Sequence, residues 1–425
     1  MNPSVLPDPT RLILKNNITL VVTPNPTVDV ISARFLLRAG SLLESAAQMG
    51  LVNLLAAVLT KGTQQRSSLD IAETVEYCGG SLSTDSGNDF FALSFKSMSG
   101  DFAKLLHLSA ELLREPSFPE AEVDLERNLI LQGIRAKQEY PFTLAFDQLK
   151  AHLYGDHPYG FANAGTIETV SALQREDLQT FHHRYFRPDN LVISIAGRIE
   201  VESCLAQVEQ TLGDWAVPAK SLEFPTYKIV DQSIVTTPQH LYLAKETHQS
   251  IVILGYLTTA VHDPSYAPLK LLSSYLGNGM SSRLFTELRE KQGLAYEVSA
   301  LYPTRLDPAL FVVYIGTSPQ NQALAGEGLQ REVDRLREEP LSEADLHTAK
   351  SKLLGQYALG KQTTGQLAQL FGWYEILGLG IEFDQIFPDK IKAISASDLQ
   401  KIATQYLHTP CSSIVGPEIA LFPTP

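Results

Sequence analysis

Cysteine is scarce in this chain of 425 residues. The three cysteines, Cys78, Cys204 and Cys411, stand far apart in the sequence. An odd and sparse set does not build a disulfide framework, and unpaired thiols are typical of a reducing compartment. We therefore expect a protein without structural disulfides.

Long apolar runs are also missing. No stretch approaches the ~20 apolar residues that a membrane-crossing helix needs. The first residues, MNPSVLPDPTRLILKNN, hold two prolines before residue 9 and no apolar core of signal-peptide length. We therefore expect a cytoplasmic protein with no membrane partner.

Positive charge is in the minority. The chain has 34 Lys and Arg against 47 Asp and Glu, a formal net charge of -13. Because phosphate binding requires clustered Lys and Arg, this balance argues against nucleic acid as a main partner. Hydrophobic residues make up 44% of the chain and charged residues 19%, which suffices for large cores. The length predicts two to three domains.

An internal repeat indicates how these domains are arranged. The segment LLAAVL (54–59) recurs as LLSSYL (271–276), an offset of 217 residues, and Gly62 and Gly279 follow at the same offset. Further along, PEAEV at 119 is echoed by SEADL at 342, an offset of 223. Ordered matches with similar offsets favour a duplicated chain.

The local patterns predict the same kinds of elements in both halves. Strand-like segments rich in β-branched and aromatic residues include ITLVVTPNP, VDVISARFLLRAG, DFFALSFKSM, NLVISIAGRI, SIVILGYL, LAYEVSALY and LFVVYIGT. Helical spacing appears in DFAKLLHLSAELLRE, APLKLLSSYLG, NQALAGEGLQREVDRLREE and DLQKIATQYL. We predict an α+β fold with antiparallel-rich sheets: an N-terminal half over 1–217, a proline-containing linker over 218–234, and a C-terminal half over 235–425.

Several motifs resemble the pitrilysin family, which includes mitochondrial processing peptidase and insulin-degrading enzyme. They are GLVNLLAAVLTKGT (50–63), HPYG (157–160), RYFRPDNLVISIAGRIE (184–200), HDPSYAPLKLLSSYLGNGMSSRLF (262–285) and SSRLFTELREKQGLAYEVSA (281–300). Their order is that of the family along nearly the whole chain. The resemblance implies two homologous α+β halves that face each other like a clam shell around a peptide chamber.

The zinc motif of that family is degenerate in this chain. The family run G-x-A-H-F-L-E-H-M-x-F-K-G-T supplies two His ligands and a Glu base on one helix, and a later Glu completes the zinc site. The matching positions here are Asn53, Ala56, Ala57 and, downstream, Gly133. Alanine and glycine have no donor atom, and one amide cannot hold zinc. The resemblance therefore implies a chain without its own zinc.

No other metal or nucleophile pattern replaces the lost motif. None of the ten histidines forms a His-x3-His or His-x2-Glu-His pair, and the adjacent His182 and His183 point to different faces of a helix. No G-x-S-x-G elbow is present, and the serines of SMSG (97–100) and GMSSR (279–283) are typical of turns. We expect no cofactor in this chain.

Arg289 and Tyr296 remain as candidate site residues. In the family, an Arg and a Tyr at this spacing lie in the second half and contact the substrate carbonyl. Preorganised donors of this kind stabilise a developing oxyanion. The alternative is that Arg289 pairs with Glu287 or Glu290 and that Tyr296 packs in a sheet.

Three functions follow from the resemblance. The chain is a pseudo-peptidase subunit that supplies Arg289 and Tyr296 in trans to a zinc-bearing homologue in a heterodimer, or a structural subunit like the core proteins of the respiratory bc1 complex, or a stand-alone peptide-binding protein. The Arg–Tyr pair favours the first.

Overall fold

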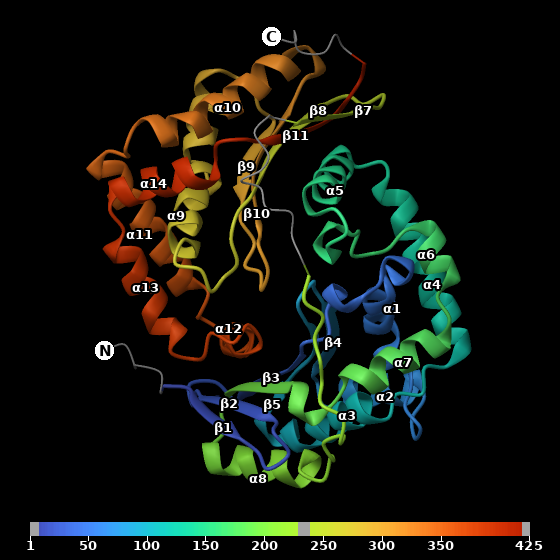
Figure 1. The fold of residues 1–425 in the computed structure, drawn as a ribbon. Helices are drawn as coiled ribbons and strands as arrows, with labels where there is room; N and C mark the ends of the chain where they lie inside the picture. The colour runs from blue at the N-terminus through green and yellow to red at the C-terminus, as the bar shows by residue number, and fades with distance from the viewer. Residues whose placement is uncertain (1–7, 228–238, 419–425) are drawn as a thin grey trace. The chain divides into compact units, whose positions relative to one another are not determined.

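The computed structural model describes residues 8–227 and 239–418 (Figure 1). Among these, residues 8–134, 162–226 and 358–383 form a first compact unit, and residues 135–161, 239–357 and 384–418 belong to a second. The predicted linker over 218–234 lies outside the described residues from 228 onwards. The boundaries at 217 and 235 stay a prediction about where the duplicated halves meet.

The first unit is built on a six-stranded mixed sheet in the order β1-β2-β6-β3-β5-β4. Only β2 and β6 run parallel, and the other neighbouring pairs are antiparallel. The strands are β1 (Thr10–Ile13), β2 (Thr19–Pro24), β3 (Val30–Leu37), β4 (Ser81–Ser86), β5 (Phe91–Met98) and β6 (Leu191–Gly197).

Helices cover this sheet and close its core. They are α1 (Leu51–Val58), α2 (Ser68–Tyr77), α3 (Phe102–Arg114), α4 (Glu120–Lys137), α6 (Ile167–Ala172), α7 (Arg175–Tyr185) and α8 (Val201–Leu212). Alternate residues of β3, such as Ala33 and Phe35, join a buried apolar cluster with Leu54 of α1 and Leu105 of α3. This alternation follows from the two-residue period of a strand, which sends successive side chains to opposite faces.

The second unit repeats this topology. Its five-stranded sheet has the order β7-β11-β8-β10-β9, in which only β7 and β11 run parallel. The strands are β7 (Gln239–Ala244), β8 (Ser250–Leu257), β9 (Glu297–Leu301), β10 (Leu310–Thr317) and β11 (Cys411–Gly416). The order corresponds to β2-β6-β3-β5-β4, and β8 begins at Ser250 as β3 begins at Val30, an offset of 220 residues. The predicted α+β class and the repeated, antiparallel-rich halves are confirmed.

The helices of the second unit are α9 (Tyr266–Gly277), α10 (Gln322–Glu338), α11 (Glu343–Leu359), α13 (Phe383–Ala393) and α14 (Ala396–Tyr406), with a π-helical segment η8 at Phe285–Lys291. Three of these helices, α9, α10 and α14, lie in segments whose spacing predicted a helix. Within residues 8–227 and 239–418, no helix combines the length and apolar character that a bilayer crossing requires.

Each half contributes one helix to the sheet of the other half. Helix α12 (Thr364–Ile376), from the second half of the sequence, packs on β3 and β6 of the first unit, while α5 (Pro141–Tyr154) packs on β8 and β11 of the second (Figure 1). A glycine permits close approach at each interface: a Cβ on Gly372 would lie 2.6 Å from Leu36, and one on Gly255 would lie 2.6 Å from Leu149. Side chains at these two positions would force helix and sheet apart.

Candidate functional site

Helix α1 carries three positions of the degenerate motif, Asn53, Ala56 and Ala57. Gly50 precedes the helix with a φ of 92°, a left-handed conformation that glycine adopts readily. The buried carboxylate of Glu44 accepts hydrogen bonds from the backbone N–H of Gly50 (3.1 Å) and of Val52 (2.7 Å). Burial raises the pKa of Glu44 to about 8, and these two donors oppose the shift. Glu44 therefore caps α1 from inside the core.

The four motif positions lie on α1 and α4 of the first unit. Asn53 and Ala57 are half-buried, whereas Ala56 is only 7% exposed, and its carbonyl accepts a 2.6 Å hydrogen bond from the hydroxyl of Thr84 on β4. Gly133 is exposed, and a Cβ there would meet no atom within 4 Å. In the parts of the chain that the structure describes, no group of three or more His, Cys, Asp or Glu is placed to hold a metal ion.

The end of the motif frame keeps polar contacts that tie it to the fold. After α1, a 3-10 turn runs over Leu59–Lys61, and Lys61 Nζ lies 2.8 Å from the carboxylate of Glu126 on α4. Glu126 is the residue seven positions before Gly133. This ion pair joins the turn that follows α1 to α4, the helix that carries Gly133.

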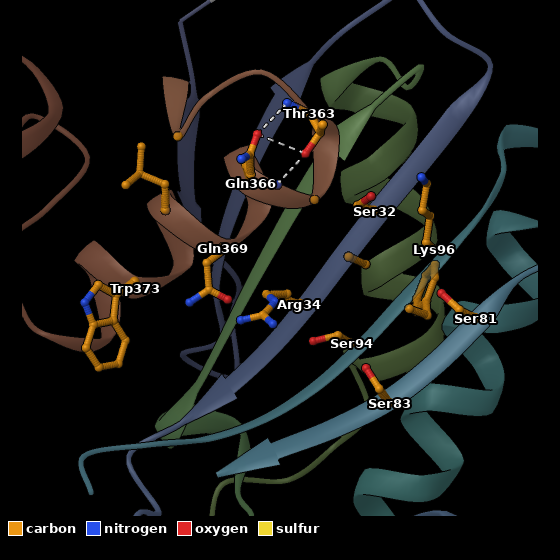
Figure 2. A pocket seen from close by; sticks show the side chains of 15 residues that line it. Ser32, Arg34, Ser81, Ser83, Ser94, Lys96, Thr363, Gln366, Gln369 and Trp373 are labelled. Carbon is orange, nitrogen blue, oxygen red and sulfur yellow. Dashed lines mark hydrogen bonds between the residues drawn. The ribbon is translucent and has the colours of Figure 1, made fainter. Parts of the chain in front are cut away.

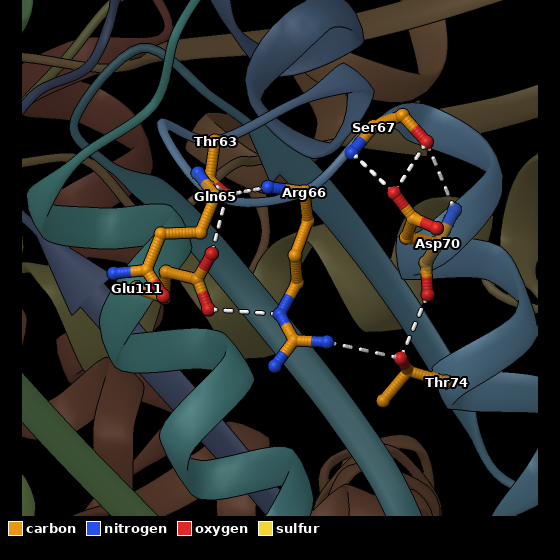
Figure 3. Close-up of polar contacts among 7 residues, drawn as sticks. All are labelled: Thr63, Gln65, Arg66, Ser67, Asp70, Thr74 and Glu111. Carbon is orange, nitrogen blue, oxygen red and sulfur yellow. Dashed lines mark hydrogen bonds and ion pairs between the residues drawn. The ribbon is translucent and has the colours of Figure 1, made fainter.

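Thr63 organises the loop between the motif and α2 (Figure 3). Its hydroxyl donates to the carboxylate of Glu111 and accepts from the backbone N–H of Gln65 (3.1 Å) and of Arg66 (2.9 Å). Arg66 Nε donates to the same carboxylate at 3.0 Å. Ser67 then caps α2, so side-chain contacts hold this loop.

Strand β4 forms an open edge beside α1. It is the last strand of its sheet among the described residues, and it alternates exposed and half-buried side chains. Leu82 and Thr84 point toward the helix-covered core and α1, while Ser81, Ser83 and Asp85 occupy the opposite face. An unpaired edge presents a row of backbone donors and acceptors, which can bind an extended peptide as an added strand.

A cavity of about 590 Å³ lies on that opposite face (Figure 2). Strands β3, β4 and β5 form its floor, and the N-terminal part of α12 forms a wall. Its polar lining includes Arg34, Lys96 and several serines.

Arg289 lies in the π-helical segment of the second unit. Its guanidinium is exposed and rests over the ring of Phe285, 4.8 Å from the centroid. Glu287, one expected alternative partner, instead binds Arg283 at 3.1 Å and Lys291 at 2.9 Å. π-Helical turns are rare and occur frequently at functional sites.

Tyr296 directly precedes β9. Its backbone N–H donates to the carbonyl of Gly316 at 2.9 Å, which extends the pairing of β9 with β10 by one residue. Its side chain is 62% exposed, so the ring does not pack inside the sheet. Gly293, with a φ of 64°, allows the chain to turn out of the π-helical segment before Tyr296.

His157 and His182 have structural partners. In the HPYG segment, His157 Nδ1 accepts from the backbone N–H of Tyr159 at 3.1 Å and caps a short 3-10 turn. His182 Nε2 lies 2.9 Å from the carbonyl of Leu113, and burial lowers the pKa of His182 to about 4. Both contacts explain these histidines without a ligand.

Two family models match this chain in sequence order. Residues 20–166 match the model described as Insulinase (Peptidase family M16), and residues 172–353 match the model described as Peptidase M16 inactive domain. The chain belongs to the M16 peptidase family. The resemblance to pitrilysins inferred from the motifs is therefore confirmed.

Relatives of this M16 chain align over nearly their whole length. An uncharacterized zinc protease from Bacillus subtilis is 27% identical over 398 residues, 93% of this chain and 95% of the relative. Another from Rickettsia bellii is 25% identical over 407 residues, 95% and 96% of the two chains. Both relatives carry the name of a zinc protease, whereas the motif positions of this chain hold no zinc ligands.

Solved structures share the fold of this M16 chain. A protease from Helicobacter pylori has a TM-score of 0.91 at 22% identity and covers 97% of this chain and 100% of its own. A peptidase M16 inactive domain from Pseudomonas fluorescens has a TM-score of 0.87 at 22% identity, with 98% and 100% covered. These similarities extend over both duplicated halves.

Proposed function

We propose that this chain is a non-catalytic, pseudo-peptidase subunit of a zinc metallopeptidase heterodimer. It closes the peptide chamber of a homologous zinc-bearing partner and supplies Arg289 and Tyr296 to the substrate carbonyl. The proposal is supported chiefly by one contrast. The positions matching zinc ligands and base carry Asn, Ala and Gly, while Arg289 and Tyr296 are both exposed.

The chemistry of α1 and α4 argues against catalysis by this chain alone. A catalytic zinc takes three protein ligands and keeps a fourth position for water. Ala57 and Gly133 offer no donor atom where two ligands would be needed, and Ala56 offers no base. We expect zinc in the partner subunit, where it would polarise the scissile carbonyl.

The chemistry of Arg289 and Tyr296 suits the stabilisation of negative charge. A guanidinium and a phenol are both hydrogen-bond donors, and neither side chain is buried in its own unit. Donors aimed at an oxygen that gains charge stabilise the transition state more than the bound peptide. Their loss is therefore expected mainly in kcat.

The open edge of β4 offers a place for the peptide itself. Its backbone can add a substrate strand beside α1, where active relatives of the family would hold their metal. Peptide binding by strand addition is also what a stand-alone binding protein would use, and it is compatible with that second candidate function. A purely structural subunit would need neither the exposed Arg289 and Tyr296 nor the open edge of β4.

We propose the cytoplasm as the compartment, because unpaired cysteines are typical of a reducing environment. Cys78, Cys204 and Cys411 are all free and buried in the structure. Burial raises the pKa of the Cys204 and Cys411 thiols to about 12, so both are poor nucleophiles.

Reconstitution with a zinc-bearing homologue from the same genome tests the proposal. Arg289→Ala and Tyr296→Phe should each lower kcat by roughly 100- to 1,000-fold, because each removes one oxyanion donor, and should leave assembly intact. Arg335→Ala, on the exposed face of α10, and Tyr77→Phe, with an 81% exposed ring on α2, are matched controls and should cleave normally. Cleavage at the wild-type rate by both test variants would contradict the proposal and favour the structural subunit.

A further inference from the structure

Two cationic side chains lie on the open face of the first sheet. Strand registers place Arg34 of β3 opposite Ser94 of β5, which is opposite Ser83 of β4. One row along, Lys96 of β5 is opposite Ser81 of β4. Figure 2 shows both cations beside these small hydroxyls at the cavity. The serines leave open space between the cations and the edge of the sheet.

Arg34 is only partly satisfied by the protein. Its Nη1 atom is buried and has no hydrogen-bond partner among the described residues. Burial lowers the pKa of Arg34, whereas the charge of Asp85, in the next row on the same face, raises it. The guanidinium as a whole is half-buried and lines the cavity, so an anion in the cavity would offset part of the free-energy cost of desolvating its charge.

The first turn of α12 adds to the positive potential. Thr363, Gly365 and Gln366 line the same cavity, and the amino-terminal end of a helix carries a partial positive charge. This feature, the guanidinium and the Lys96 ammonium all favour an anion at one place.

We propose that this cavity is a subsite for carboxylate side chains of a peptide strand added to β4. The inference rests on the proposed function, in which β4 holds a peptide. Strands in a sheet are about 4.8 Å apart, so an added strand lies roughly 10 Å from β5. An extended Lys96 and a Glu side chain facing Ser81 or Ser83 together span that gap. A position facing Asp85 rejects acidic side chains.

Binding of two otherwise identical peptides to the purified chain tests this subsite. Each peptide has ten residues, blocked ends and a fluorescent label. Two alternate positions near one end are both Glu or both Gln, and all other positions are Thr. The pair can then lie opposite Ser81 and Ser83 while Thr lies opposite Asp85. We expect the Glu peptide to bind about tenfold more tightly than the Gln peptide, as charge-assisted hydrogen bonds predict. The net charge of -13 repels the Glu peptide generally, so this preference requires a local cationic site.

Variants localise the preference. Lys96→Gln and Arg34→Gln should each lower the ratio of the two affinities toward one and leave the Gln peptide unchanged. Lys96 is exposed, so its variant folds even if Arg34→Gln disturbs packing. Lys15→Gln, an exposed lysine between β1 and β2 at the opposite edge of the sheet, is the matched control and should keep the ratio.

The outcomes of this experiment distinguish a failure of the carboxylate subsite from a failure of peptide binding at β4. Equal binding of both peptides to the wild type, or a ratio that survives in both variants, overturns the subsite while peptide binding at β4 stands. If neither peptide binds, both the subsite and peptide binding at β4 are contradicted.

Discussion

Helices α1 and α9 occupy corresponding places in the two halves, but they carry different polar residues there. At the 217-residue offset, Asn53 of α1 corresponds to Lys270 of α9. Lys270 Nζ donates to the carbonyl of Tyr302 at 2.6 Å, and burial lowers its pKa to about 8. Arg289 and Tyr296 likewise correspond to Ala72 and Gly79 of the first half. The two halves share the order of their strands, whereas the residues at these corresponding positions differ.

The largest expected effect is on zinc binding, when the ligands missing from α1 and α4 are restored. We expect the wild-type chain to bind no stoichiometric zinc. A variant with Asn53→His, Ala56→Glu, Ala57→His and Gly133→Glu should bind about one zinc per chain, because the space at Gly133 admits a side chain. Metal analysis after dialysis measures this.

The second half supplies the control for zinc binding. Lys270→His, Ser273→Glu and Ser274→His place the same residues on α9 and should bind no zinc. About one tightly bound zinc in the wild type would show that the degenerate motif had been misread.

Cavities at matching positions should be the next largest effect. Leu54 and Leu271 are both fully buried, and Leu→Ala at either should cost about 2–5 kcal/mol of unfolding free energy. Trp215 and Trp373, the only tryptophans of the chain, both belong to the first unit. Tryptophan fluorescence in urea should therefore shift more for Leu54→Ala than for Leu271→Ala. Equal shifts would mean that the units unfold together.

The Glu44 cap should make the stability of the first unit depend on pH. Its folded pKa of about 8 lies above the usual 4.5, so the native state holds a proton that the unfolded chain releases. The stabilisation is complete below pH 4.5 and is lost as pH rises through 8, by up to about 1.4 kcal/mol per pH unit.

Glu44→Gln isolates this effect. The amide cannot titrate. It keeps one oxygen acceptor, which can serve Val52, while its NH2 group replaces the oxygen that accepts from Gly50. Its tryptophan-detected urea midpoint should change less between pH 6.5 and 8 than that of the wild type. An identical pH profile in the two proteins would refute the assignment.

The smallest effect is expected at Lys61. Its pair with Glu126 is partly exposed, and such pairs contribute about 0–1 kcal/mol. Lys61→Gln should therefore lower the urea midpoint only slightly. A loss comparable to that of Leu54→Ala would assign the pair a larger structural role.

Most buried strands could be predicted from the sequence, but β11, which is buried at every position, was not predicted. β2, β3, β5, β6, β8 and β10 all lie in segments rich in β-branched or aromatic residues, and the repeat predicted their duplication. β4, with the sequence SLSTDS, was missed because an exposed edge strand needs little apolar surface. The repeat offset from β9 was the signal that could have located it.

The site was predictable only in part. Motif alignment needs sequence order alone. It named the candidates Asn53, Ala56, Ala57, Gly133, Arg289 and Tyr296, whose roles stay predictions. The pairing of Arg34 with Ser94 depends on strand register, which no local pattern specifies. The exchange of α5 and α12 was equally hidden, because an apolar helix face does not say which sheet it will cover.

That exchange has a consequence for the order of folding during translation. β6 ends at Gly197, but the helix that covers β3 and β6 begins only at Thr364. During translation, one face of the first sheet therefore stays uncovered until α12 has been synthesised. That face includes Leu36, which is fully buried in the complete chain. Distant contacts of this kind slow folding and prolong exposure to aggregation. A ribosome-released fragment ending near residue 217 would keep that face open and would depend on chaperones.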